Sequence, residues 1–257
     1  MSEPRILLWD IETGYDLVTV FGLYGNKYIP HYALQQERYM ICAAWKVLGQ
    51  KKVDSVSILD NKKRFSASPV DDYHVTKTLH DLLSGVDAVV AHNGDNFDMK
   101  FFNGRALYHG LGPLPPVTQI DTLKIAKRFF KLNSNRLDYI GKYLGVGQKT
   151  TTDQSLWLRC LNGEEKAVKT MVKYNRNDVL LLEAVYKRLA PYDDKGVNFN
   201  LFVDPDDPVC PKCGSHHLQK RGIKRALTRA YHQYQCQSCR GWSRAVTCDK
   251  TYTSKMR

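Results

Sequence analysis

Residues 6–14 of the 257-residue chain read ILLWDIETG, an apolar run that carries two acids one residue apart. Side chains alternate along a strand, so Asp10 and Glu12 point to the same side, at the carboxyl end of a strand expected over 6–10. An unpaired carboxylate is costly to bury. Either the two acids lie just past the buried part of the strand, or a cation holds them. Oxygen ligands favour a hard cation such as Mg²⁺ or Mn²⁺.

The pattern of apolar residues beyond this stretch predicts an α/β fold, with a mixed sheet flanked by helices. Further strands are expected over 40–47 and 53–59, within 87–94, and at the start of 119–130. Helices are expected over 71–85, 98–109, the later part of 119–130, 135–147 and 164–189. Asn162 and Glu165 predict a capping box at the start of the last helix.

The first residues lack the basic-then-apolar pattern of a secretory signal, and no apolar run approaches the roughly 20 residues that span a membrane. A cytoplasmic protein without membrane contact is therefore expected, for which a bacterial or phage-infected cell is plausible. The net charge is +12 at pH 7, and it is uneven. From Cys210 onward the sequence contains eleven Lys and Arg residues and a single acid, Asp249. This segment suits a polyanion, although a solubilising tail is the plainer alternative.

Four of the seven cysteines form two C-x-x-C pairs in this basic segment, with 22 residues between the pairs. The spacing predicts one structural Zn²⁺ held by Cys210, Cys213, Cys236 and Cys239. Zinc would supply stability that a segment of about 45 residues cannot obtain from its own core. Two disulfides are the alternative. The expected units are a larger α/β domain over 1–192, a linker over 193–208 and a zinc ribbon over 209–257.

Two further acids stand in settings that match Asp10 and Glu12. Asp98 in AHNGDNFD (91–98) follows a buried strand, and Asp178 lies on the last helix. Tyr174 is four residues before Asp178, so the two share one helix face. Four carboxylates can hold two metal ions, an arrangement suited to in-line displacement at phosphorus, and a tyrosine hydroxyl beside them could orient the attacking water.

DIET (10–13), HNGDNFD (92–98) and YNRND (174–178) resemble, in order and spacing, the three exonuclease motifs of the DEDD (DnaQ-like) superfamily. The resemblance covers residues 1 to about 190. Lys173 stands where the histidine subclass has His, so the sequence is similar to the tyrosine subclass, and within it to YprB-like and family B polymerase-type exonuclease domains. The resemblance implies an RNase H-like fold, two Mg²⁺ or Mn²⁺ ions held by Asp10, Glu12, Asp98 and Asp178, and Tyr174 as the water-orienting residue.

Several other residues are candidates for binding the substrate. Thr13 and Asn93 flank the first two motifs, although Asn93 could equally cap a turn. Asp121 is expected to support the site or cap a helix, and His92 to be packed. The basic segment interleaves cations with Tyr231 and Tyr234, which suits a nucleic-acid backbone with exposed bases; its candidates are Lys220, Arg221, Lys224, Arg225 and Arg229. A purely structural or protein-docking ribbon is the alternative.

The leading hypothesis is a monomeric, metal-dependent 3′-to-5′ exonuclease that hydrolyses single-stranded DNA ends to nucleoside monophosphates. Its partners would be nucleic acid and a polymerase or other replication protein, in replication or repair. The alternatives are a non-catalytic module that binds nucleic acid or a replication partner, and an RNA-directed exonuclease. Discrimination between DNA and RNA rests on contacts around the 2′-hydroxyl, which the motifs do not specify. A transposase-like endonuclease fits the ribbon but not the three motifs.

Overall fold

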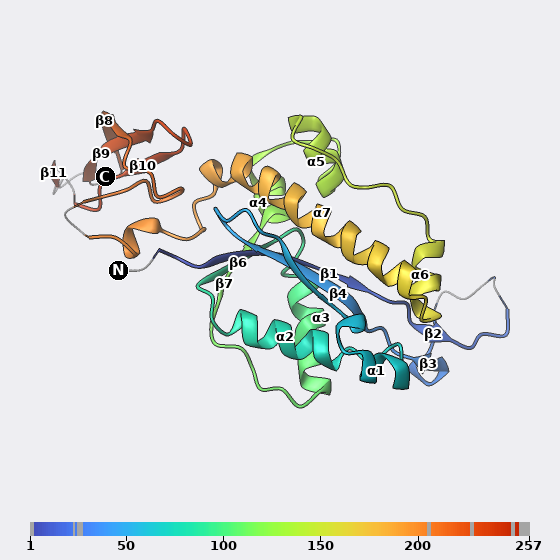
Figure 1. Cartoon of the computed structure of the whole chain (residues 1–257). Coiled ribbons are helices and arrows are strands. Elements are labelled where there is room, and N and C mark those ends of the chain that lie inside the picture. Colours follow the sequence, from blue (N-terminus) through green and yellow to red (C-terminus); the bar gives the residue numbers. More distant parts are fainter. Residues whose placement is uncertain are drawn as a thin grey trace.

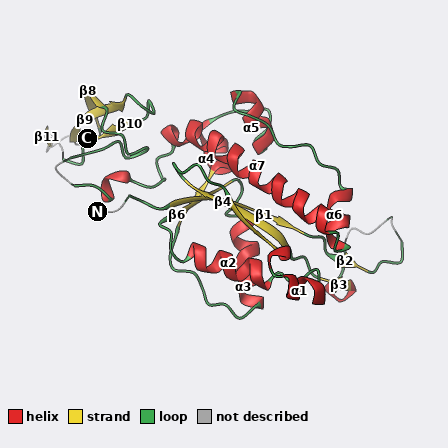
Figure 2. Ribbon diagram, viewed as in Figure 1, coloured by secondary structure: helices red, strands yellow, loops and turns green. Residues whose placement is uncertain are grey.

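The computed structural model describes residues 3–22, 24, 28–204, 207–226, 229–247 and 250–251. A five-stranded mixed sheet with helices on both faces is followed by a small β-ribbon unit (Figures 1 and 2). The order across the sheet is β5-β4-β1-β6-β7. β1 pairs antiparallel with β4 and parallel with β6, so the sheet is mixed, as expected. Its strands are β1 (Ile6–Thr13), β4 (Met40–Val47), β5 (Asp54–Ser57), β6 (Ala88–Ala91) and β7 (Thr118–Asp121).

The helices divide between the two faces of the sheet (Figure 1). α2 and α3 cover one face, with α1 beside them, while α7 crosses the other face with α4 and α5. The bounds are α1 (Lys62–Ala67), α2 (Tyr73–Leu83), α3 (Asp98–Tyr108), α4 (Thr122–Phe129), α5 (Leu137–Leu144), α6 (Ser155–Leu161) and α7 (Glu165–Leu189). The described residues also form short 3-10 helices, which are η1 (His31–Ala33), η2 (Ile58–Asp60), η3 (Ala190–Tyr192) and η4 (Phe199–Leu201).

The alternation of side chains along β1 decides which face receives the acids. Leu7, Trp9 and Ile11 pack into the core shared with α2 and α3. Ile6 and Leu8 pack into the core shared with α4, α5 and α7. Because strand side chains alternate, Asp10 and Glu12 continue the row of Ile6 and Leu8 and point toward α7.

Some element boundaries differ from the expectation. β1 continues to Thr13, so both acids lie inside the strand, paired with Ala44 and Cys42 of β4. The short helices α1 and α6 were not predicted. The capping box is wrong, because Glu164 is the N-cap of α7 and its side chain makes no capping hydrogen bond. Asn162 instead ends α6.

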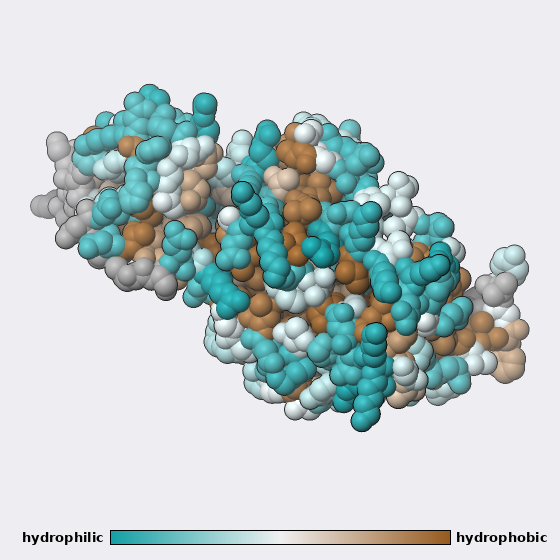
Figure 3. Space-filling model, in the orientation of Figure 1, coloured by the Kyte–Doolittle hydropathy of each residue, from teal (hydrophilic) through white to brown (hydrophobic). Residues whose placement is uncertain are grey.

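A two-stranded arm leaves the sheet after β1. It consists of β2 (Leu17–Val18) and β3 (Leu34–Gln36), which pair antiparallel. Its described residues include the exposed aromatic side chains Phe21, Tyr24, Tyr28 and Tyr32. Brown, apolar atoms lie at the end of the molecule that carries this arm, and others are scattered among the hydrophilic atoms over the middle of the same face (Figure 3). Among the described residues no helix is both long and apolar enough to cross a membrane.

The ribbon unit lies beyond the C-terminal end of α7 (Figure 1). Its strands are β8 (Leu218–Arg225), β9 (Arg229–Cys236), β10 (Trp242–Arg244) and β11 (Lys250–Thr251), and β9 pairs with the other three. The unit is attached to the larger domain by direct contacts. Lys212 Nζ donates a hydrogen bond of 2.7 Å to the carbonyl of Asp193. Gly241 comes so close that a Cβ there would lie 3.3 Å from the carbonyl oxygen of Pro191.

Candidate functional site

Three of the predicted acids meet on the α7 side of the sheet. Asp10 and Glu12 of β1 and Asp178 of α7 each place a carboxylate oxygen within 4.8 Å of the others. The strand supplies two of them through its alternation. The helix supplies the third because Val179 and Leu182, beside Asp178, are buried against the sheet and fix the rotation of α7. Asp178 is 1% exposed.

Asp98, the fourth predicted acid, lies next to this cluster but outside it. It is the first residue of α3 and is 3% exposed. Its Oδ1 accepts a hydrogen bond of 3.2 Å from the amide of Ile11, between the two acids of β1. Its charge is one of the causes that raise the pKa of Asp10. The four acids are therefore neighbours, with Asp98 held by the backbone of β1.

Burial and crowding raise the pKa values of all four carboxyl groups. Burial is the largest cause for each, and repulsion from the neighbouring acids adds to it for Asp10 and Glu12. The pKa of Asp10 lies well above its usual value, that of Glu12 rises to about 8, and that of Asp98 to about 7. The pKa of Asp178 is also raised, although Lys149 opposes the effect. Four such groups are ionised together at neutral pH only with cations beside them.

Lys149 supplies one such cation, and the sequence analysis missed it. The segment after α5 carries Lys149 to the site, where its ammonium forms an ion pair with Asp178. Its Nζ also lies 3.4 Å from the hydroxyl of Tyr174. Burial disfavours the charged amine, but Asp178 and Asp10 outweigh burial and raise the pKa of Lys149. A single lysine in the polar stretch GVGQKTTTDQS gives no sequence signal for this contact.

Two neighbours on α7 complete the surroundings of the acids. Asn175 is fully buried and its Nδ2 donates a hydrogen bond of 2.6 Å to Oδ2 of Asp10. Tyr174 lies one turn before Asp178 on α7. Burial raises the pKa of the Tyr174 hydroxyl to about 12. The tyrosine therefore stays protonated at neutral pH and can donate a hydrogen bond. Trp157 of α6 contacts its ring edge-on, with 6.3 Å between the ring centroids.

The donor set of the site suits a divalent cation. All four acids offer oxygen ligands, which Mg²⁺ and Mn²⁺ prefer. Oδ1 of Asp178 is buried and has no hydrogen-bond partner among the described residues. An orphaned carboxylate oxygen beside two other carboxylates is a ready ligand position, so this cluster could bind metal.

The other predicted residues of the larger domain surround these acids. Thr13 follows Glu12 at a register shift between β1 and β4. Asn93 has a φ of +69°, and its amide donates a hydrogen bond of 2.8 Å to Oδ1 of Asp121. The same Oδ1 accepts a 2.9 Å bond from the amide of Leu123, so Asp121 caps α4, as expected. His92 is packed, with its ring nitrogens 2.9 Å from the Thr122 hydroxyl and 2.9 Å from the Asn135 carbonyl.

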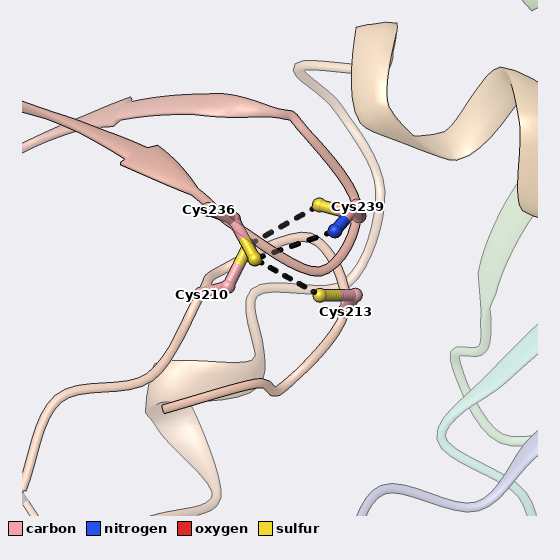
Figure 4. Close-up of side chains that lie close together, drawn as sticks. All are labelled: Cys210, Cys213, Cys236 and Cys239. Atoms are coloured by element: carbon pink, nitrogen blue, oxygen red, sulfur yellow. Dashed lines mark hydrogen bonds between the residues drawn. The ribbon is translucent and has the colours of Figure 1, made fainter. Parts of the chain in front are cut away.

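The four predicted cysteines gather in the ribbon unit (Figure 4). Sγ of Cys210 lies 3.7 Å from that of Cys239, and Sγ of Cys213 lies 3.7 Å from that of Cys236. Four sulfurs about 2.3 Å from a tetrahedral zinc ion lie about 3.8 Å apart. A disulfide needs sulfurs about 2.05 Å apart. The spacing therefore fits a shared metal ion rather than two disulfides.

The basic candidates of the ribbon lie along one strand and the start of the next. Lys220, Arg221, Lys224 and Arg225 are exposed on β8, and Arg229 is exposed at the start of β9. Lys220 Nζ lies 2.8 Å from Nε2 of His232. The guanidinium of Arg244 lies 4.1 Å from the centroid of the Tyr231 ring. The structure thus gathers these cations on the ribbon, away from the carboxylates.

Comparison with known proteins agrees with this architecture. A family model described as the RNase H superfamily matches residues 7–190. Comparison with curated proteins finds no match. Among solved structures, the family B DNA polymerase from the hyperthermophilic archaeon Pyrobaculum calidifontis is similar in fold, with a TM-score of 0.53 and 18% identity. That match covers 74% of this chain but 25% of the polymerase. Because the family model spans most of the chain, including all four acids, this protein belongs to the RNase H superfamily.

Proposed function

We propose that this protein is a metal-dependent 3′-to-5′ exonuclease of the tyrosine subclass of the DEDD superfamily, which hydrolyses single-stranded DNA ends to nucleoside monophosphates. The observation that carries the proposal is the convergence of Asp10, Glu12 and Asp178 within 4.8 Å, with Asp98 adjacent and Tyr174 on the same helix face as Asp178. Membership of the RNase H superfamily supports nuclease chemistry on a nucleic acid.

Each side chain has a role that its contacts support. Asp10, Glu12, Asp98 and Asp178 would hold two Mg²⁺ or Mn²⁺ ions, which when bound stabilise the negative charge that develops at the scissile phosphate. The protonated hydroxyl of Tyr174 orients the attacking water beside Asp178. Asn175 fixes the carboxylate of Asp10 through its hydrogen bond to Oδ2. Thr13 and Asn93 would contact the terminal nucleotide.

Lys149 acts as a positioning residue. Its ammonium pairs with Asp178 and is 3.4 Å from the Tyr174 oxygen, so it holds both side chains from one point. A cation there also lowers the repulsion among the acids before metal arrives. The loop that carries Lys149 therefore contacts the carboxylates on one side and a hollow at the surface of the domain on the other.

The ribbon is proposed to be a zinc ribbon that helps to bind the nucleic acid. Its four cysteines would hold one structural Zn²⁺, consistent with the sulfur spacing. The exposed cations Lys220, Arg221, Lys224, Arg225 and Arg229 would contact phosphates. The corresponding units are an exonuclease domain over 1–192, a linker over 193–208 and the ribbon over 209–257.

One observation favours a second candidate, a module that binds nucleic acid without cutting it. Lys149 already neutralises part of the charge at the acids, as a metal ion otherwise would. In that case the site would keep its shape through Lys149 and Asn175 alone. The two functions differ in whether a bound strand is hydrolysed when a divalent cation is added.

The deciding experiment incubates 5′-labelled linear single-stranded DNA with Mg²⁺ or Mn²⁺, beside a circular strand and a linear RNA. Wild type is compared with Asp10→Ala and with Asp81→Asn, whose acid is exposed on α2. An exonuclease gives a ladder that shortens from the 3′ end with wild type and Asp81→Asn. The ladder is absent with Asp10→Ala, on the circle and in EDTA.

Other outcomes reassign the function. Cutting of the circle indicates an endonuclease. Degradation of RNA but not DNA identifies an RNA-directed enzyme. Intact linear strands that remain bound to the protein in both metals establish the binding module and overturn the catalytic proposal.

A further inference from the structure

We propose that a groove between α4, α5 and residues 148–152 binds the phosphate backbone of a single strand whose end lies at the carboxylates. This inference rests on the proposed function, since it names the path by which the substrate reaches that site. The strand is recognised through its phosphates, so the ligand chemistry is that of any single-stranded polynucleotide.

The groove is a hollow of about 860 Å³ that reaches the site of the acids through Lys149. Its lining includes His92 and Asn93, from the segment that leads to Asp98, as well as Lys149. Because Lys149 pairs with Asp178, the groove and the carboxylate site share a side chain. A strand lying in the groove therefore ends at the reacting groups.

The charge of the groove is strongly positive. In the described part of the chain, four basic residues and one acid, Asp138, line it. Two of the cations are paired, since Lys142 binds Asp138 at 2.7 Å and Lys149 binds Asp178. The other two, Lys127 of α4 and Arg136 before α5, are exposed and form no ion pair with any carboxylate that the structure describes. Unpaired cations at fixed positions along a groove suit successive phosphates of one strand.

The remaining lining explains why the backbone, rather than the bases, is bound. Besides the cations it consists mainly of hydroxyl and amide groups, including Thr150, Thr151 and Thr152. Among the lining residues that the structure describes there is no Phe, Tyr or Trp, so they offer no platform on which bases stack. Binding is therefore expected to depend on salt and to tolerate any sequence.

The size of the groove distinguishes a single strand from a duplex. Pockets of about 300–1,000 Å³ enclose ligands of drug size, which is the scale of a few nucleotides. A double helix is too wide for such a hollow. Lys127 also lines a second hollow of about 520 Å³ along α4, where Lys124 pairs with Asp95 and Arg128 pairs with Asp194. The strand would leave the groove in that direction, toward the end of the domain that carries the ribbon.

The test measures binding of a 5′-fluorescent 12-nucleotide oligo(dT) by anisotropy in EDTA, where hydrolysis does not interfere, over a range of salt concentrations. The variant is Lys127→Ala with Arg136→Ala. The matched control is Lys62→Ala with Lys63→Ala, two exposed lysines of α1 on the opposite face of the sheet. An oligo(U) of the same length is measured in parallel.

Two lost phosphate contacts should weaken binding on the order of tenfold near 0.1 M salt and flatten the slope of log affinity against log salt by about 1.4. The control should keep the wild-type slope, and Lys127→Arg with Arg136→Lys should restore it. Oligo(U) should behave like oligo(dT). A groove variant that keeps the wild-type slope overturns the proposal.

This readout is separate from the test of the exonuclease. If wild type degrades no strand but the groove variant still loses its salt slope, the groove stands and the proposed catalysis falls. If wild type degrades the strand but the groove variant keeps the wild-type salt slope, the proposed catalysis stands and the groove proposal falls.

Discussion

The carboxylate site and the cysteine cluster each bring together ligand residues from distant segments, but they are held in opposite ways. Asp10, Glu12 and Asp178 lie on a sheet and a long helix with two large apolar cores around them. In the described part of the ribbon the buried apolar side chains are only Val209, Cys210, Ala230, Tyr231 and Cys236. Two of those five are themselves cysteines of the cluster.

This contrast indicates which of the two units depends on bound metal for its folding. In the larger domain the hydrophobic cores stabilise the structure, and the acids are tolerated within it at a cost. In the ribbon a metal ion bound by four thiolates would contribute most of the folding free energy. Loss of an acid should therefore remove activity and leave the fold, whereas loss of a cysteine should remove the local fold.

The largest effect is expected for Cys236→Ser. A structural zinc site contributes on the order of 10 kcal/mol to a small unit, far more than the few buried side chains of the ribbon. Hydrogen exchange should show loss of protection over β8 and β9 with protection retained over β1 and β4. The bound zinc should fall from one ion per chain to none.

Gln237→Ala is the control for this variant, because Gln237 lies between the two cysteines of the same turn and, among the described residues, its side chain donates a hydrogen bond to the carbonyl of Gln235 and not to a cysteine. If the ribbon stayed protected from hydrogen exchange in the absence of zinc, the contrast would fail, because the unit would then fold without a metal ion.

Asp98→Asn should have an intermediate effect, on activity alone. The amide keeps an oxygen that can accept the hydrogen bond from Ile11 but cannot supply a charged metal ligand. A loss of several kcal/mol of transition-state stabilisation corresponds to a fall on the order of 10³-fold in the rate of hydrolysis. The thermal midpoint should stay within a few degrees of wild type. A variant that unfolds instead would show that this acid also holds the domain together.

The smallest effect concerns the pH dependence of stability without metal. Glu12 has a pKa of about 8 in the fold against an ordinary value of 4.5. The folded state thus holds the proton more tightly, so this group stabilises the fold fully below about pH 4.5 and the stabilisation is lost as pH rises through about 8. Urea unfolding in EDTA should show stability falling between pH 5 and 8, and Glu12→Gln should reduce that fall by on the order of 2 kcal/mol. If wild type and Glu12→Gln lost the same stability between pH 5 and 8, ionisation of the buried Glu12 would not destabilise the fold.

The sheet was predictable because its strands have strong local patterns. The bounds of β4 agree with the expected strand over 40–47, and β6, α3 and α7 lie where apolar periodicity indicated them. β1 runs three residues further than expected. The acids at its end are accommodated by Asn175 and Lys149, and these contacts across the fold leave no trace in the local sequence.

The misses have physical causes of their own. α1 and α6 have six and seven residues, too few for a helical period to show. The capping box at Asn162 fails because Gly163, with a φ of +75°, turns the chain between α6 and α7. Asn175 could have been found, because it continues the buried row of α7 between Met171 and Asp178 at helical spacing. Lys149 could not, because its position depends on how a polar loop folds back over α7.

The length of α7 has a consequence for how far a strand can be trimmed. One uninterrupted helix carries Asp178 near its middle and ends at Leu189, where the ribbon is attached. At about 1.5 Å per residue, the helix places its end about 16 Å from Asp178 along the axis. Under the proposed function, a strand bound by the ribbon would be shortened only until its free end no longer reaches Asp178, and this length of α7 is part of the distance that it must span. The length of the shortest product would then report a dimension of the protein rather than a property of the nucleic acid.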